Sequence, residues 1–66
     1  MATQALRDAI EAHVDKSSVG DVLDALSDVC MDKSYHIREL WQGESLARSW
    51  ARDAKRIDQC AGKVEN

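Results

Sequence analysis

The fold is decided by VGDVLDALSDVCMDKSYHIRELW, residues 19–41, where apolar side chains recur every three or four positions without a proline. That spacing gathers them on one side of an α-helix. Ser18, with Asp21 three residues later, has the pattern of a capping box that opens a helix, and Gly43 fits a left-handed C-cap. We therefore predict a long helix over residues 18–42. Its apolar stripe consists of Val19, Val22, Leu23, Leu26, Val29, Cys30, Ile37, Leu40 and Trp41.

Lys33 and Ser34 interrupt the apolar stripe of this helix with two polar residues. The interruption marks the point at which the helix could kink or break. No proline or glycine accompanies it, so the sequence leaves a continuous helix and a broken one open.

Two further helices flank the long one. Thr3 can cap a helix over residues 3–16, and Gly62 closes a helix over residues 45–61. Both repeat apolar residues at helical spacing: Leu6, Ile10 and Val14 in the first, and Leu46, Trp50, Ala54, Ile57 and Ala61 in the second. The sequence thus predicts an all-α fold, an antiparallel helical hairpin with a shorter N-terminal helix.

The 66 residues form one domain, spanning 1–66, with a small core. Such a core rarely supplies more than about 3–5 kcal/mol, so we expect the chain to self-associate, in the first instance as a dimer. The N-terminal helix must lay its apolar side on the hairpin or on another copy of it. Counting back from a turn at Gly43 predicts the facing residues of the hairpin. The expected neighbours are Trp41 with Leu46, Ile37 with Trp50, Lys33 with Ala54, and Cys30 with Ile57.

The net charge of -3 hides an asymmetry along the chain. Residues 1–32 carry seven acidic and two basic side chains, a net charge of -5, whereas residues 33–56 carry six basic and three acidic ones, a net charge of +3. Acidic residues at helical spacing form a stripe on the long helix, and basic residues form one on the third helix. The acidic stripe is Asp21, Asp24, Asp28 and Asp32, and the basic stripe is Arg48, Arg52 and Lys55 or Arg56.

Two interpretations of these stripes stay open. They can neutralise each other across the hairpin, where the expected register brings Asp32 near Lys55 and Glu39 near Arg48, and each exposed pair then contributes about 0.2–1 kcal/mol. Alternatively, either stripe is a docking surface for an oppositely charged partner.

Aromatic and basic residues gather near the predicted turn. Trp41 and Trp50 either fill the hairpin core or form a binding surface, since tryptophan serves both purposes. With arginines beside them, they could stack a nucleobase whose phosphates are held by basic groups. The candidate anion-binding residues are His36, Arg38, Arg48, Arg52 and Arg56.

Several functional classes find no support in the sequence. Cys30 and Cys60 are too few for a disulfide scaffold and no charged-then-apolar leader opens the chain, so we expect a reducing, cytoplasmic location. No apolar run is long enough for a membrane span, and no metal-ligand spacing, glycine-rich phosphate loop or nucleophile motif occurs. We therefore expect no cofactor, no metal and no catalysis, and the negative charge argues against a nucleic-acid polymer as partner.

The stretch HIRELWQ, residues 36–42, followed by Ala47 and Trp50, resembles a group of small uncharacterised helical proteins found in bacterial genomes and their phages. The resemblance covers the second half of the chain and transfers no catalytic residues. It implies a cytosolic accessory protein of a mobile element, acting in the bacterial host cell if it is phage-borne. Acidic helical phage proteins of this size often act stoichiometrically, by masking a host defence protein or sequestering its nucleotide signal.

Together these observations predict a non-catalytic helical binding protein that acts stoichiometrically on a protein partner, as an inhibitor or adaptor. The expected docking surface consists of Asp21, Asp24, Asp28, Asp32, Trp41 and Trp50. Two alternatives stay open: an oligomeric protein that binds a nucleotide or small anion, and a structural oligomer that serves as a scaffold.

Overall fold

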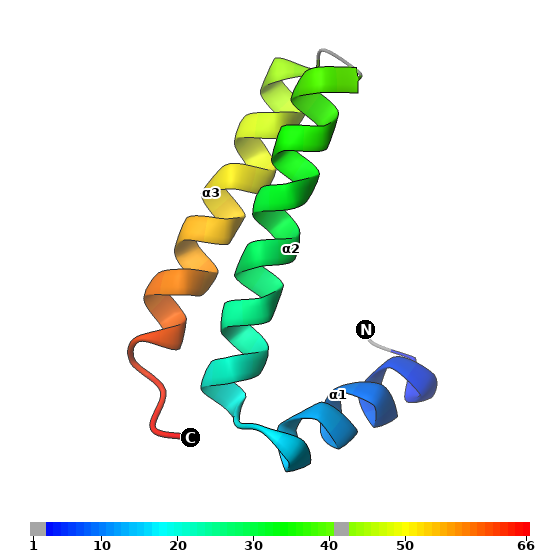
Figure 1. Cartoon of the computed structure of the whole chain (residues 1–66), viewed down its shortest axis with the longest axis vertical. Coiled ribbons are helices and arrows are strands. Elements are labelled where there is room, and N and C mark those ends of the chain that lie inside the picture. The colour runs from blue at the N-terminus through cyan, green and yellow to red at the C-terminus, as the bar shows by residue number, and fades with distance from the viewer. Residues whose placement is uncertain (1–2, 41–42) are drawn as a thin grey trace.

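The computed structural model describes residues 3–40 and 43–66. Three helices make up the fold: α1 (Gln4–Lys16), α2 (Val19–Leu40) and α3 (Glu44–Ala61). The two long helices, α2 and α3, run antiparallel side by side, and α1 leaves the hairpin at an angle (Figure 1). The predicted all-α hairpin with a shorter N-terminal helix is thus confirmed. The predicted end of the long helix, at Trp41 and Gln42, lies outside the described residues.

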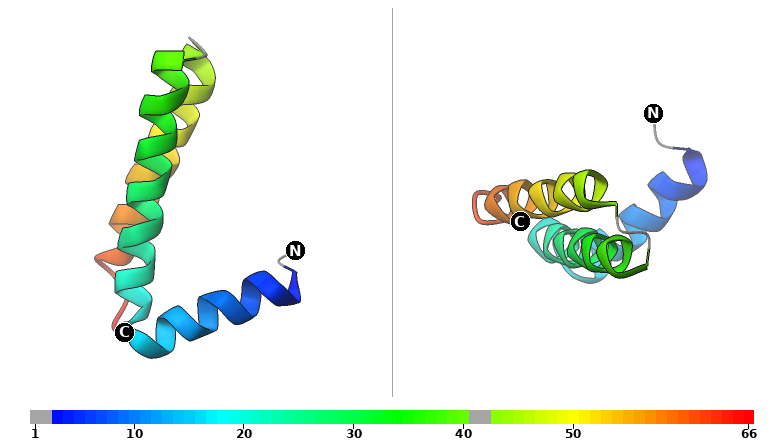
Figure 2. Two further views of the ribbon diagram at one scale, coloured as in Figure 1. Left: turned by 45° about the vertical axis from the view of Figure 1, so that its right-hand side comes forward. Right: turned by 90° about the horizontal axis from the view of Figure 1, so that it is seen from above.

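Local capping sets the first two helix starts, as the sequence predicts. The Thr3 hydroxyl accepts a hydrogen bond from the Leu6 amide at 3.2 Å, and the Ser18 hydroxyl accepts one from the Asp21 amide at 3.0 Å. Each bond satisfies an amide that the first helical turn leaves without a partner. Only Ser17 and Ser18 separate α1 from α2, and the two helices diverge from this short elbow (Figure 2).

Small side chains join α2 to α3. The Ser34 hydroxyl donates a hydrogen bond to the Ala47 carbonyl at 2.7 Å, and the Ser27 hydroxyl donates one to the Ala54 carbonyl at 2.8 Å. Both alanines are completely buried. Because a side-chain hydroxyl reaches the opposite backbone directly, the two helices approach closely along this line. We call these four residues the Ser/Ala interface.

The Ser/Ala interface corrects the predicted register. It pairs Ala54 with Ser27, whereas counting from Gly43 placed Ala54 beside Lys33, six residues further along α2. The same shift separates Ile37 from Trp50 and Cys30 from Ile57. The remaining expected pair includes Trp41, which lies outside the described residues. The physical reason is that the Ser27 and Ser34 hydroxyls bond to alanine carbonyls of α3, and these contacts, rather than the position of Gly43, set the alignment.

The interruption of the apolar stripe at Lys33 and Ser34 does not break the helix. α2 runs without a break through these positions, and only 2% of the Ser34 surface is exposed. Its hydroxyl is satisfied by the Ala47 carbonyl, so a polar side chain is tolerated in the core. The residue that the sequence pattern marks as a weak point is therefore a central contact of the hairpin.

Candidate functional site

Ion pairs at the hairpin tip show how α2 and α3 are aligned. Glu44 of α3 pairs with Arg38 of α2 at 3.8 Å and with Arg48 of its own helix at 3.4 Å. Arg38–Glu44 is the one ion pair between α2 and α3 among residues 3–40 and 43–66. The expected pairs of Asp32 with Lys55 and Glu39 with Arg48 do not form, because the register that predicted them is shifted.

The acidic stripe lies along the exposed side of α2. All four of its carboxylates, Asp21, Asp24, Asp28 and Asp32, are exposed. None of the four takes part in an ion pair within the described part of the chain. Direct contact with the basic residues of α3 therefore does not neutralise the stripe.

Helical geometry places the acidic stripe at one edge of the hairpin. Each residue of an α-helix is rotated by about 100° from the one before. Starting from Ser34, which faces α3, this rotation puts Arg38, Asp24 and Asp28 on the same side of α2. The Arg38–Glu44 pair identifies that side as the edge shared with Glu44.

Trp50 lies at the opposite edge. Trp50 and Glu44 flank Ala47 at three positions in either direction, so they point to opposite sides of the line along which α3 contacts α2. Trp50 is half-buried, so part of its side chain is covered by the hairpin and part faces solvent. The structure therefore does not bring Trp50 together with the acidic stripe, and Trp41 lies outside the described residues.

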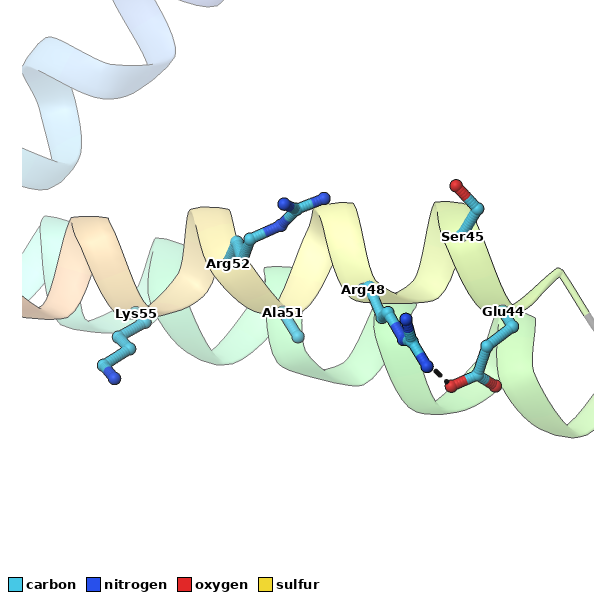
Figure 3. Close-up of a pocket in the computed structure, with 6 residues that line it drawn as sticks. All are labelled: Glu44, Ser45, Arg48, Ala51, Arg52 and Lys55. Atoms are coloured by element: carbon cyan, nitrogen blue, oxygen red, sulfur yellow. Dashed lines mark ion pairs between the residues drawn. The ribbon is translucent and has the colours of Figure 1, made fainter.

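The basic residues of α3 border a shallow surface depression. Figure 3 shows Arg48 held by Glu44, whereas Arg52 and Lys55 extend in different directions. Neither Arg52 nor Lys55 forms an ion pair with a described residue. The depression is lined by Glu44, Ser45, Arg48, Ala51, Arg52 and Lys55.

The structure separates the five predicted anion-binding residues. Arg38 and Arg48 share Glu44 at the hairpin tip, and Arg56 pairs with Asp53 at 3.9 Å. His36 is exposed on the far side of α2 from Arg38, because residues two positions apart do not share a helix face. Lys55, which is not among the five predicted residues, lines the depression beside Arg48 and Arg52. Its seven-residue spacing from Arg48 is the sequence signal that places both on one face of α3.

A second hollow lies at the inner angle between α1 and α2. It is lined by Ile10, His13, Ser17, Asp21, Val22 and Ala25. Ile10 and Val22 bring apolar side chains from the two helices into it. The N-terminal helix leaves its apolar side open, since 52% of Leu6 and 43% of Ile10 are exposed.

The two cysteines lie apart in the described part of the chain. Cys30 is buried and Cys60 is exposed, and both are free thiols. The corrected register places Cys30 level with Ala51, more than two turns from Cys60. Residues 3–40 and 43–66 contain no cluster of three His, Cys, Asp or Glu side chains able to hold a metal ion. None of their helices is long and apolar enough to cross a membrane.

Comparison with known proteins adds no relative. No family model, curated protein or solved structure matches this chain. Three features of the molecule bear on its function: the acidic stripe, the basic depression and the uncovered apolar side chains.

Proposed function

We propose that this chain is a non-catalytic binding protein that acts stoichiometrically on a protein partner. The observation that carries the proposal is the acidic stripe of α2, whose four exposed carboxylates have no ion-pair partner among the described residues. The stripe spans twelve residues of one helix, which is about 16 Å. A straight row of like charges of this length favours a partner with a basic helix or groove.

The negative charge of the acidic stripe favours binding to a basic partner more than it favours folding of the chain. Four like-charged side chains on one side of a helix repel one another and destabilise that helix by a few tenths of a kcal/mol per neighbouring pair. A basic partner removes that repulsion and accelerates encounter. An inhibitor or adaptor that covers a basic surface of its target fits these properties, as does the masking of a host protein that the sequence resemblance implies.

The acidic stripe gives a direct mutational test. Reversing Asp24 and Asp28 together to lysine should reduce partner capture at least about tenfold, because each rim charge contributes to encounter and alignment. The measurement is a quantitative pull-down from extract of the source cells, with circular dichroism as the check on folding.

A matched control changes the same charge elsewhere. Reversing Asp58 and Glu65 to lysine alters the net charge by the same amount at exposed positions outside the stripe. Capture should persist in this control. Equal capture by the two variants and the unchanged protein would remove the acidic stripe from the proposal.

A second candidate function rests on the basic depression of α3. Arg52 and Lys55 offer two cationic groups without an ion pair in the described residues, and both line the depression together with the small side chain of Ala51. Such a surface suits a nucleotide phosphate or another small anion, which arginine recognises through paired hydrogen bonds.

Native mass spectrometry tests this second candidate. The protein purified from its source cells should carry an added mass of a few hundred daltons per site, and Arg52→Ala should remove it without loss of helicity. Arg56→Ala is the control, because Arg56 already pairs with Asp53 outside the depression. A mass that equals the bare chain, or added mass that survives Arg52→Ala, would contradict nucleotide binding at this depression.

A further inference from the structure

The exposed large aliphatic side chains gather on one side of the molecule. Six of them are between 43% and 66% exposed: Leu6 and Ile10 of α1, Leu26, Val29 and Leu40 of α2, and Leu46 of α3. The rotation that places the acidic stripe on one side of the line through Ser34 places the three α2 residues on the other. Leu46 likewise lies on the Trp50 side of α3. We call these six residues the apolar face.

The apolar face is continuous with the inner angle of the elbow. Ile10 and Val22 both line the hollow between α1 and α2. Val22, Leu26 and Val29 continue from there along α2 at helical spacing. The face therefore has two limbs, one on α1 and one on the hairpin; Figure 2 shows how these two elements diverge from the elbow.

The exposed area of the chain is too large for a compact monomer. The accessible surface is 5412 Å², whereas a compact monomer of this mass exposes about 4,200 Å². The radius of gyration is 13.4 Å, against about 11 Å for a compact domain of this length. The surplus of about 1,200 Å² exceeds the roughly 800 Å² that each partner buries in a standard stable interface.

We infer that a second copy of this chain covers the apolar face, with α1 of each copy lying along α2 of the other. The thirteen residues of α1 extend about 20 Å, and the limb on α2 from Val22 to Leu40 extends about 27 Å, so the arm fits along it. The contact is self-complementary, because both limbs belong to every copy, as a two-fold symmetric dimer requires. Asp24, Asp28 and Asp32 stay on the outside, whereas Asp21 lines the hollow at the elbow, so the inference does not require the proposed partner.

The oligomeric mass in solution tests this inference. Sedimentation equilibrium of the full chain across the micromolar range should give twice the chain mass of 7.4 kDa. Leu26→Glu should raise the dissociation constant at least about 100-fold, because the buried carboxylate occurs twice in a symmetric dimer. Tyr35→Glu is the control on the same helix. Tyr35 is 57% exposed on the acidic side, so this variant should remain a dimer.

A mixing experiment tests the placement of α1. Leu6→Glu and Leu26→Lys should each dissociate alone, and an equimolar mixture should form a heterodimer with one glutamate–lysine contact and one unchanged contact. Circular dichroism checks that each variant keeps its helices, since both leucines are about half exposed in the single chain. A 7.4 kDa species for the unchanged protein at every concentration would overturn the inference. So would a mixture that stays monomeric.

The two proposals can fail separately. Sedimentation is measured without any partner, and the acidic-stripe variant Asp24→Lys/Asp28→Lys should keep the dimer mass. Loss of capture with an intact dimer concerns the acidic stripe alone. A monomeric unchanged protein that still captures its partner refutes only the dimer.

Discussion

Replacing Ala54 by leucine is expected to destabilise the hairpin by about 3 kcal/mol, most of the stability that a chain of this size has available. Ala54 is completely buried, and its carbonyl accepts a hydrogen bond from the Ser27 hydroxyl at 2.8 Å. Three additional heavy atoms have no space between helices that approach so closely. They must push α2 away and break the Ser27 hydrogen bond.

Urea unfolding followed by circular dichroism measures this effect. Ala12→Leu is the matched control, because Ala12 is exposed on α1 and the same substitution should change stability there by no more than about 0.5 kcal/mol. Both variants are compared at one protein concentration, since association also contributes to stability. An unchanged unfolding midpoint for Ala54→Leu would contradict the close approach of α2 and α3.

Replacing Trp50 by alanine is expected to cost about 2 kcal/mol. Truncation of a fully buried tryptophan to alanine destabilises a protein by about 3–5 kcal/mol. Trp50 is only half-buried, so part of its surface already contacts water and the expected loss of stability is smaller. The loss arises from apolar area that α3 no longer covers at the edge of the hairpin opposite the acidic stripe.

Tyr35→Ala is the aromatic control for Trp50. Tyr35 is 57% exposed on α2, and its truncation should change stability by no more than about 0.5 kcal/mol. Thermal unfolding of both variants at matched concentration distinguishes them. A Trp50→Ala protein that unfolds at the same temperature as the unchanged one, yet no longer binds its partner, would assign Trp50 to a binding surface and not to the core.

Local sequence signals predicted the helices because local chemistry determines them. Thr3 and Ser18 supply the hydroxyls that cap α1 and α2, and these bonds join residues three positions apart. The period of the apolar residues identified which segments are helical. Both signals act within a few residues, so a single sequence is sufficient to find them.

The pairing of the helices could not be predicted from the same signals. Counting apolar residues favours contacts between large side chains. Ser27 and Ser34 instead donate hydrogen bonds to backbone carbonyls, which every residue has whatever its side chain. Seven-residue spacing of serines on α2 and of alanines on α3 is the pattern that could have indicated the contact. In the sequence alone, a polar residue within an apolar stripe indicates a possible break instead.

The candidate site was predictable by composition and not by arrangement. The acidic stripe follows from spacing along one helix, and the structure places its residues together on one exposed side. Trp50 is separated from that stripe because the two lie at opposite edges of the hairpin. Which edge of α2 lies beside which edge of α3 is shown by the Arg38–Glu44 ion pair. Information about two helices at once was needed for that step.

The Ser/Ala interface also affects how this protein can evolve. Four small side chains at the centre of the hairpin determine its alignment, and most of the remaining described positions are at least partly exposed. Substitutions at exposed positions away from special contacts usually change stability little. The outer surface can therefore accumulate new charges and new contacts while the hairpin stays intact.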